Sequence, residues 1–230
     1  MSTIKRQMSE SLLVGTLLAL AGGFLDAYTY LIRDHVFANA QTGNIVLLGV
    51  HMMNGEWMQA LYYLIPILSF AAGVLLVLVV RTKVQDDSRL HWRQVIVIVE
   101  IALLFAVAFL PQQLNMLANV LVSFTCAMQV EGFRKIRGVT CATTMCTGNL
   151  RSATELMWNY RKTGDRDLRR RSLHYYGVDI IFVFGAMIGA FVTKLAAERA
   201  VLTVCVVLGA AFFAMFLEED IFERDLFSGK

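Results

Sequence analysis

The sequence predicts an all-α membrane protein, with six transmembrane helices and two short re-entrant half-helices arranged as an inverted internal repeat. Of its 230 residues, 57% are hydrophobic and 17% are charged, whereas soluble domains carry about 25% charged residues. The apolar residues form long blocks, several of them near the ~20 residues that a helix needs to cross the bilayer core. The tripeptide Thr-Gly-Asn occurs twice, at 42–44 and 147–149, each time between longer apolar blocks.

Six apolar runs are candidate spans. They are Leu12–Ile32, Ala60–Val80, Val95–Leu110, Leu114–Phe133, Tyr175–Leu195 and Ala200–Leu217. Two shorter segments, Thr42–Met53 and Thr147–Tyr160, begin with Thr-Gly-Asn. As helices these segments would reach only about 18–21 Å, which is too short to cross comfortably. We therefore interpret both as re-entrant.

The distribution of Lys and Arg predicts the orientation. Loops 81–93 and 161–171 are rich in basic residues, whereas loop 111–113 has none. Cytoplasmic loops collect Lys and Arg, so we expect the two basic loops and both termini in the cytoplasm. If the two short segments also crossed, loop 81–93 would lie outside, against its charge. This argument favours six crossings.

The two halves of the chain match in the order of their parts. Within a single membrane domain covering 1–230, residues 12–110 form the first repeat and residues 114–217 the second. Each repeat has a span, an irregular linker, Thr-Gly-Asn with its short segment, and two further spans. Three crossings per half is an odd number, so the second half must be inverted. Inverted repeats are a feature of many secondary transporters.

The repeated tripeptide predicts a ligand site. Each half-helix would start near the bilayer midplane, where Thr or Asn caps free N–H groups and Gly permits close approach. Two helix N-termini aimed at one point suit an anion or a carboxylate. The alternative is a tight packing turn without a ligand. The predicted substrate-binding residues are Thr42, Gly43, Asn44, Thr147, Gly148, Asn149, Arg151, Asp26 and Gln129.

Acidic residues also occur within the apolar runs. Asp26 lies well inside the first span. We consider it a candidate for proton or cation coupling, or for pairing with Arg151, because acids inside a membrane usually mark a pathway or a pair. A helix-capping or interhelical hydrogen bond is the alternative. Glu100, Glu131 and Asp179 are interpreted as interfacial residues near the ends of spans.

Enzymatic signatures are absent from the sequence. The four cysteines form no C-x-x-C pair, and no histidines occur at metal-ligand spacing. There is no G-x-x-x-x-G-K-[ST], G-x-S-x-G or H-E-x-x-H motif. We expect no metal, no cofactor, no nucleic-acid partner and no enzymatic activity.

Two further motifs surround the tripeptides. The first motif comprises Gly23, Asp26, Ala27, Tyr30, Val36, Phe37, Thr42, Gly43, Asn44 and Gly49. The second comprises Cys126 to Gln129, Phe133, Arg134, Thr144 and Met145 to Leu150. Together they resemble the YoaK-type family of bacterial integral membrane proteins, a domain of unknown function. The resemblance covers nearly the whole chain and implies a bacterial inner-membrane protein. The chain departs from the family pattern at Val130 and Glu131, where Gln129 should precede an Asn and no acid is expected. A weaker likeness, to the fold of sulfate-type anion and nucleobase transporters, rests on the paired half-helices alone.

These features lead to one preferred function and two alternatives. The preferred function is a secondary transporter or channel for a small solute, anions included, whose partners are a small molecule or ion and the lipid bilayer. One alternative is a non-transporting scaffold or sensor that uses the basic loop 161–171. A lipid-modifying membrane enzyme is less favoured. A homodimer is plausible, because symmetric dimers are the commonest assembly.

Overall fold

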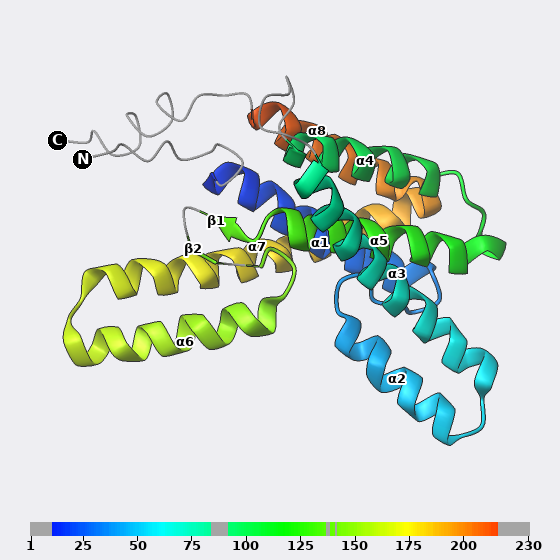
Figure 1. Cartoon of the computed structure of the whole chain (residues 1–230), viewed down its shortest axis with the longest axis horizontal. Coiled ribbons are helices and arrows are strands. Elements are labelled where there is room, and N and C mark those ends of the chain that lie inside the picture. The colour runs from blue at the N-terminus through cyan, green and yellow to red at the C-terminus, as the bar shows by residue number, and fades with distance from the viewer. Residues whose placement is uncertain (1–10, 84–91, 137–138, 141, 216–230) are drawn as a thin grey trace.

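The computed structural model describes residues 11–83, 92–136, 139–140 and 142–215. Nearly all of these residues are helical, which confirms the predicted all-α class (Figure 1). The helices are α1 (Leu12–Ile32), α2 (Gln41–Met53), α3 (Trp57–Lys83), α4 (Trp92–Val107), η2 (Gln112–Leu114), α5 (Asn115–Gly132), α6 (Cys146–Thr163), α7 (Arg166–Ala196), η3 (Ala197–Val201) and α8 (Leu202–Ala214). The exception is a short antiparallel pair, β1 (Lys135–Ile136) with β2 (Val139–Thr140).

Each of the eight segments expected from the sequence coincides with an α-helix. The first span has the predicted bounds, and α2 and α6 each begin one residue before their Thr-Gly-Asn. The end of the sixth predicted span (216–217), most of the first basic loop (84–91) and Cys141 lie outside the described residues.

The second basic segment, 161–171, was predicted to be a loop, but most of it is helical. Helix α6 continues to Thr163 and α7 begins at Arg166, so only two residues separate them. Gly164 adopts the left-handed conformation that ends α6, with φ of 71° and its N–H bonded to the Tyr160 carbonyl. Asp165 then caps α7 by accepting the Asp167 N–H at 2.9 Å. The hydropathy of the chain marks where the bilayer ends, not where the helix ends.

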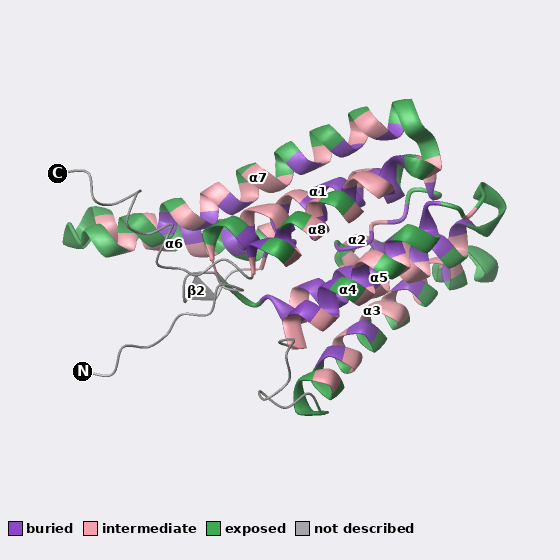
Figure 2. Ribbon diagram, turned by 90° about the horizontal axis from the view of Figure 1, so that it is seen from above, coloured by how far each residue is buried: buried purple, intermediate pink, exposed green. Residues whose placement is uncertain are grey.

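The described helices can be divided into those that fill the interior and those that expose apolar side chains. Helices α1 and α5 are buried over much of their length, whereas α3 and α7 expose broad apolar faces (Figure 2). Helix α1, helix α3 and the stretch Arg166–Ala214 are each long and apolar enough to cross a bilayer. Such exposed faces are expected where lipid replaces water. The chain is therefore a helical membrane protein.

Glycines set the closest helix contacts. Helix α1 packs along α7, and α5 packs along α3. A Cβ atom on Gly185 of α7 would collide with the backbone carbonyl of Leu20 in α1. A Cβ on Gly73 of α3 would likewise collide with the carbonyl of Phe124 in α5. Small residues allow backbones to approach closely, as is common between membrane helices.

The packing pairs of the two halves correspond to one another. The pair α1–α7 corresponds to α5–α3, α2–α3 to α6–α7, and α1–α8 to α5–α4. If α1, α2, α3 and α4 are exchanged for α5, α6, α7 and α8 in that order, each of these pairs becomes its counterpart. Both views show α6 extending toward one end of the molecule and α2 toward the other (Figures 1 and 2).

Candidate functional site

The first Thr-Gly-Asn segment fastens its own linker. Asn44 is fully buried, four residues into α2. Its Nδ2 donates to the Phe37 carbonyl at 2.8 Å and to Gln41 Oε1 at 2.9 Å. Its Oδ1 accepts the Phe37 N–H at 3.4 Å. One side chain therefore satisfies both backbone groups of a residue in the irregular linker.

The second segment repeats this contact. Asn149 is buried four residues into α6, and its Nδ2 donates to the Ala142 carbonyl at 2.7 Å. This bond spans seven residues, as does the bond from Asn44 to Phe37. Asn149 Nδ2 also donates to Asp179 Oδ1 on α7 at 3.0 Å. The polar end of each tripeptide is thus engaged within the protein.

The prediction that Thr or Asn caps these helices was wrong. The N-cap residues are Ala40 and Met145, and neither makes a side-chain cap bond. Side chains in a helix point back toward its N-terminus. An Asn four residues in therefore passes the first turn and reaches the linker. Thr42 and Thr147 are exposed at the first turns, which receive no side-chain cap.

The glycines of the tripeptides have different surroundings. A Cβ on Gly43 would lie 3.3 Å from the Phe37 ring, whereas Gly148 faces open space. Gly43 therefore makes room for its own linker. Gly148 leaves the first turn of α6 accessible.

The two linkers meet on α1. From the first linker, Asn39 donates its Nδ2 to the Gly22 carbonyl at 3.1 Å and its backbone N–H to Asp26 Oδ1 at 2.8 Å. From the second linker, Thr144 places its methyl group 2.5 Å from where a Cβ on Gly22 would stand. We call these four residues, Gly22, Asp26, Asn39 and Thr144, the linker junction.

Gln129 supports the second linker as Asp26 supports the first. Its Nε2 donates to the Leu18 carbonyl of α1 at 2.9 Å and to Thr143 Oγ1 at 3.2 Å. The structure therefore brings Asp26 and Gln129, both predicted as substrate-binding residues, to the linkers. Asp26 holds the backbone of the first linker, and Gln129 holds a side chain of the second.

The remaining predicted residues are placed differently. Arg151 is exposed on α6 and makes no ion pair with Asp26 within the described residues. Glu100 is buried in the middle of α4, 1% exposed, so its interpretation as an interfacial residue was wrong. Asp179 is half-buried against Asn149. Glu131 lies at the end of α5, as expected.

A buried arginine, Arg33, is not among the residues that the sequence singled out. Arg33 is fully buried just after α1. Its guanidinium donates to Tyr28 Oη at 2.8 Å, to Asn115 Oδ1 at 2.9 Å and to the Leu110 carbonyl at 3.0 Å. Carbonyls beyond the end of α4 carry partial negative charge that a cation stabilises. Its sequence signal was an isolated cation directly after the first apolar run, away from the basic segments.

Polar contacts around Arg33 close this corner of the molecule. Asn119 donates to the Arg33 carbonyl at 2.8 Å, and Tyr28 donates to the Glu198 carbonyl at 3.1 Å. Asp34 has φ of 64° and accepts from Asn115 at 2.9 Å. A positive φ at a residue other than glycine is unfavourable unless its surroundings impose it. The network therefore imposes the turn that starts the first linker.

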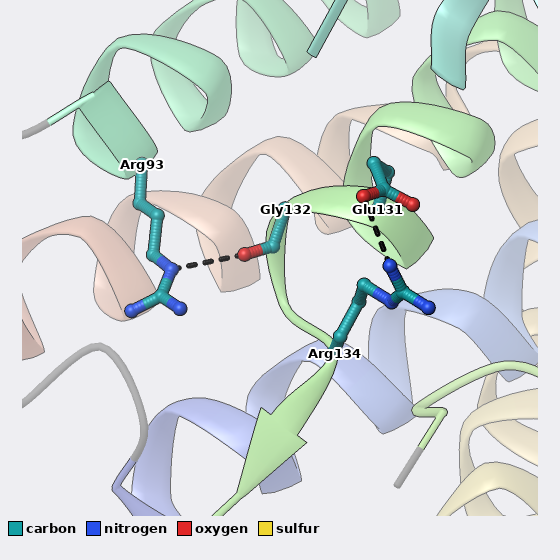
Figure 3. Close-up of polar contacts among 4 residues, drawn as sticks. All are labelled: Arg93, Glu131, Gly132 and Arg134. Carbon is teal, nitrogen blue, oxygen red and sulfur yellow. Dashed lines mark hydrogen bonds and ion pairs between the residues drawn. The ribbon is translucent and has the colours of Figure 1, made fainter. Parts of the chain in front are cut away.

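Figure 3 shows the polar contacts of Arg93 and Arg134 at the corner that follows α5. Arg93, at the start of α4, donates its Nε to the Gly132 carbonyl at 2.9 Å. Arg134 pairs with Glu131 at 3.3 Å, and the Arg134 side chain is 62% exposed. An ion pair this exposed contributes little to stability.

The fold and these contacts define an integral membrane protein built from helices, in which α2 (13 residues) and α6 (18 residues) are both entered through partly buried irregular linkers. The chain belongs to the family described as Protein of unknown function (DUF1275), whose model matches residues 14–214. It is similar to the UPF0700 transmembrane protein YoaK of Bacillus subtilis (strain 168), with 28% identity over 188 residues, 76% of this chain and 80% of that protein. The predicted family resemblance is confirmed. No solved structure matches the chain.

Proposed function

We propose that the protein is a secondary transporter or channel for a small solute, with anions as the first class to test, and not an enzyme. Its solute site would lie between the first turns of α2 and α6, near the bilayer midplane. The protein would have six crossings and two re-entrant half-helices, with both termini in the cytoplasm of a bacterium.

One observation carries this proposal. Two half-helices without side-chain caps begin from linkers that meet at Gly22 in the interior. The first turn of a helix has free N–H donors and about half a positive charge. Irregular backbone at membrane depth is tolerated where it is buried or lines a cavity. Opposed broken helices at the midplane are the usual substrate site in inverted-repeat transporters.

The packing pairs support an inverted repeat. The packing pairs α1–α7 and α1–α8 have counterparts in α5–α3 and α5–α4, and α2–α3 has its counterpart in α6–α7. The repeated Asn-to-carbonyl contact has the same spacing in both halves. Chance similarity between apolar helices would not reproduce a polar contact. We therefore propose that residues 12–110 and 114–217 are oppositely oriented copies of one unit.

The length of α7 supports the proposed orientation. Its 31 residues would span about 46 Å, well beyond the ~30 Å hydrocarbon core. The excess falls at its arginine-rich beginning, since the rest of the helix is apolar. Cytoplasmic segments collect Lys and Arg, which supports a cytoplasmic position for the α6–α7 turn.

The experiment is a screen followed by a flux assay. Thermal unfolding of the purified protein would be measured with chloride, sulfate, phosphate, short carboxylates and amino acids at constant ionic strength. A ligand that binds only the folded state raises its stability. Solutes that stabilise the protein would then be tested as radiolabels for uptake into proteoliposomes.

Variants test the position of the site. We expect the double variant Thr42→Val and Thr147→Val to fold and to lose most uptake, because it changes only exposed first-turn side chains. Thr82→Val, at the far end of α3, is the matched control and should transport normally. Unchanged uptake in the double variant would remove the half-helix N-termini from the mechanism.

A scaffold or sensor is the second candidate. Its specific support is the exposed basic hairpin of α6 and α7, where Lys162 lies 5.0 Å over the Trp158 ring. Such a hairpin could bind acidic lipid or an acidic partner. Replacing Arg169, Arg170 and Arg171 with Gln separates the roles. A topological anchor predicts changed orientation alone, whereas a docking surface predicts lost binding to anionic vesicles with orientation kept.

A further inference from the structure

The linker junction contains oxygen atoms without a hydrogen-bond partner. Within the described residues, these include Asn39 Oδ1 and Thr144 Oγ1. Their residues are only 3% and 5% exposed. Each stands three residues before the Thr of its Thr-Gly-Asn, so the two positions are equivalent in the two halves. Buried polar atoms are normally paired, and an exception in this place needs a reason.

A carboxylate belongs to the same junction, one helical turn along α1 from Gly22. Asp26 is 8% exposed, and its Oδ1 accepts the Asn39 backbone N–H. No Lys or Arg forms an ion pair with it in the part of the chain that the structure describes. An isolated charge in an apolar interior is costly. A positive partner at this point would offset that cost.

The donor set defines the chemistry of that partner. The junction offers a carboxylate, an amide oxygen and a hydroxyl oxygen, all hard ligands of the kind preferred by hard cations. Described residues contain no cluster of three His, Cys, Asp or Glu that could hold a transition metal or a highly charged ion. One negative charge among neutral oxygens suits a single positive charge.

We propose that the linker junction binds a sodium ion, with Asp26, Asn39 Oδ1 and Thr144 Oγ1 as ligands. Since the ligands come from α1 and from both linkers, sodium would fix the relative positions of the two half-helix N-termini. Sodium is then also the coupling ion of transport. The coupling rests on the proposed function, whereas sodium binding does not.

Binding is tested on the purified, detergent-solubilised protein. Retention of ²²Na⁺ and the midpoint of thermal unfolding would be measured in NaCl, KCl and choline chloride at equal ionic strength and pH. We expect saturable ²²Na⁺ binding. The midpoint of thermal unfolding should rise with NaCl over the same concentration range as binding, and should not rise with KCl or choline chloride.

Three variants distinguish a ligand from a structural role. Asp26→Asn keeps an acceptor for the Asn39 N–H but removes the charge. Thr144→Val keeps the methyl group against Gly22 but removes the hydroxyl. Both variants should bind sodium at least tenfold more weakly than the unchanged protein. Their unfolding midpoints in sodium-free buffer should not be lower. Thr193→Val is the matched control, because it removes another buried, unpartnered hydroxyl, on α7, and its sodium response should be unchanged.

Several outcomes would overturn the sodium site. The first is an equal midpoint of thermal unfolding in NaCl and choline chloride. The second is full sodium affinity in Thr144→Val. The third is an unfolding midpoint that depends on pH through Asp26 but does not depend on sodium. Solute uptake that proceeds equally in choline chloride would reject the coupling but leave the transporter proposal intact. Sodium binding without uptake of any solute would reject the transporter proposal but leave the sodium site intact.

Discussion

The two Thr-Gly-Asn segments share one contact and differ in the other. In both, the Asn amide holds a linker carbonyl seven residues upstream. The second bond of Asn44 stays inside α2, on Gln41, whereas that of Asn149 crosses to Asp179 on α7. Asp179 lies four residues after Tyr175, the first of two adjacent tyrosines in α7. The residue four positions after Tyr62, which begins the equivalent pair in α3, is Pro66, and it has no side-chain acceptor. The shared contact shapes the linker, and the other contact determines how firmly each half-helix is held.

The corners that follow α1 and α5 differ in the same way. Arg33 is buried and holds the chain between α4 and α5, while Arg134 is exposed beside Glu131. In the first half, a buried arginine network closes the corner after α1, while the Asn44 side chain makes no bond to the described residues of α3. In the second half, the arginine at the corner after α5 is exposed, while the Asn149 side chain bonds Asp179 of α7.

The largest expected effect is at the corner after α1. Arg33→Leu removes the donors for Tyr28, Asn115 and the Leu110 carbonyl, and a buried group left unpaired costs about 1–3 kcal/mol. We expect a loss of at least about 3 kcal/mol on this basis, measured by thermal or denaturant unfolding in detergent. Arg134→Leu, the matched control, should cost under about 1 kcal/mol. Equal losses in the two variants would contradict the difference between the corners.

The next effect tests the correspondence between α1–α7 and α5–α3. Gly185→Ala and Gly73→Ala each force a Cβ against a facing backbone carbonyl. Overpacking of this kind typically costs about 1–3 kcal/mol, and we expect losses of similar size in the two variants. The unfolding midpoint in detergent is the measurement.

Gly177→Ala is the control for this pair. No atom lies within 4 Å of a Cβ at Gly177, also in α7. This change should be neutral or stabilise the helix by up to about 1 kcal/mol. A loss in Gly185→Ala with none in Gly73→Ala would break the correspondence between the halves.

The third effect separates the shared contact from the differing one. Asn44→Leu removes the donor to the Phe37 carbonyl and the acceptor of the Phe37 N–H, and Asn149→Leu removes the donor to the Ala142 carbonyl and to the Asp179 carboxylate. Both variants should lose about 1–3 kcal/mol, with Asn149→Leu losing more because a charge is involved. Hydrogen exchange of the linkers is the second measurement, and faster exchange should appear only in the linker whose Asn is changed.

The elements of the fold could be predicted from the sequence because they depend on local chemistry. Apolar blocks located α1 with its observed bounds, and the tripeptides located the starts of α2 and α6 within one residue. The end of α6 and the start of α7 could not be placed by hydropathy, since both helices continue through charged residues.

The roles of single side chains in the site could be predicted only in part. The sequence indicated that Asp26 and the two Asn residues matter. It could not show that the Asn amides turn back to the linkers, because that depends on the path of an irregular chain. The burial of Arg33 likewise depends on Leu110 and Asn115, which lie far from it in the sequence. Long-range partners of this kind leave no periodic signal.

The smallest effect isolates the tie between α6 and α7. Asp179→Asn keeps an oxygen that accepts from Asn149, whereas Asp179→Leu removes it while the bond to the Ala142 carbonyl remains. We expect Asp179→Leu to cost about 1 kcal/mol, the usual net value of one hydrogen bond, and Asp179→Asn to cost less than half of that. The reverse change in the first half, Pro66→Asp, supplies no gain unless Asn44 can turn from Gln41 to the new carboxylate. Equal unfolding midpoints for both Asp179 variants would show that the Asn149–Asp179 bond adds nothing to the Ser172–Ala153 bond, the Thr154–Tyr176 bond and the apolar contacts that also join α6 to α7.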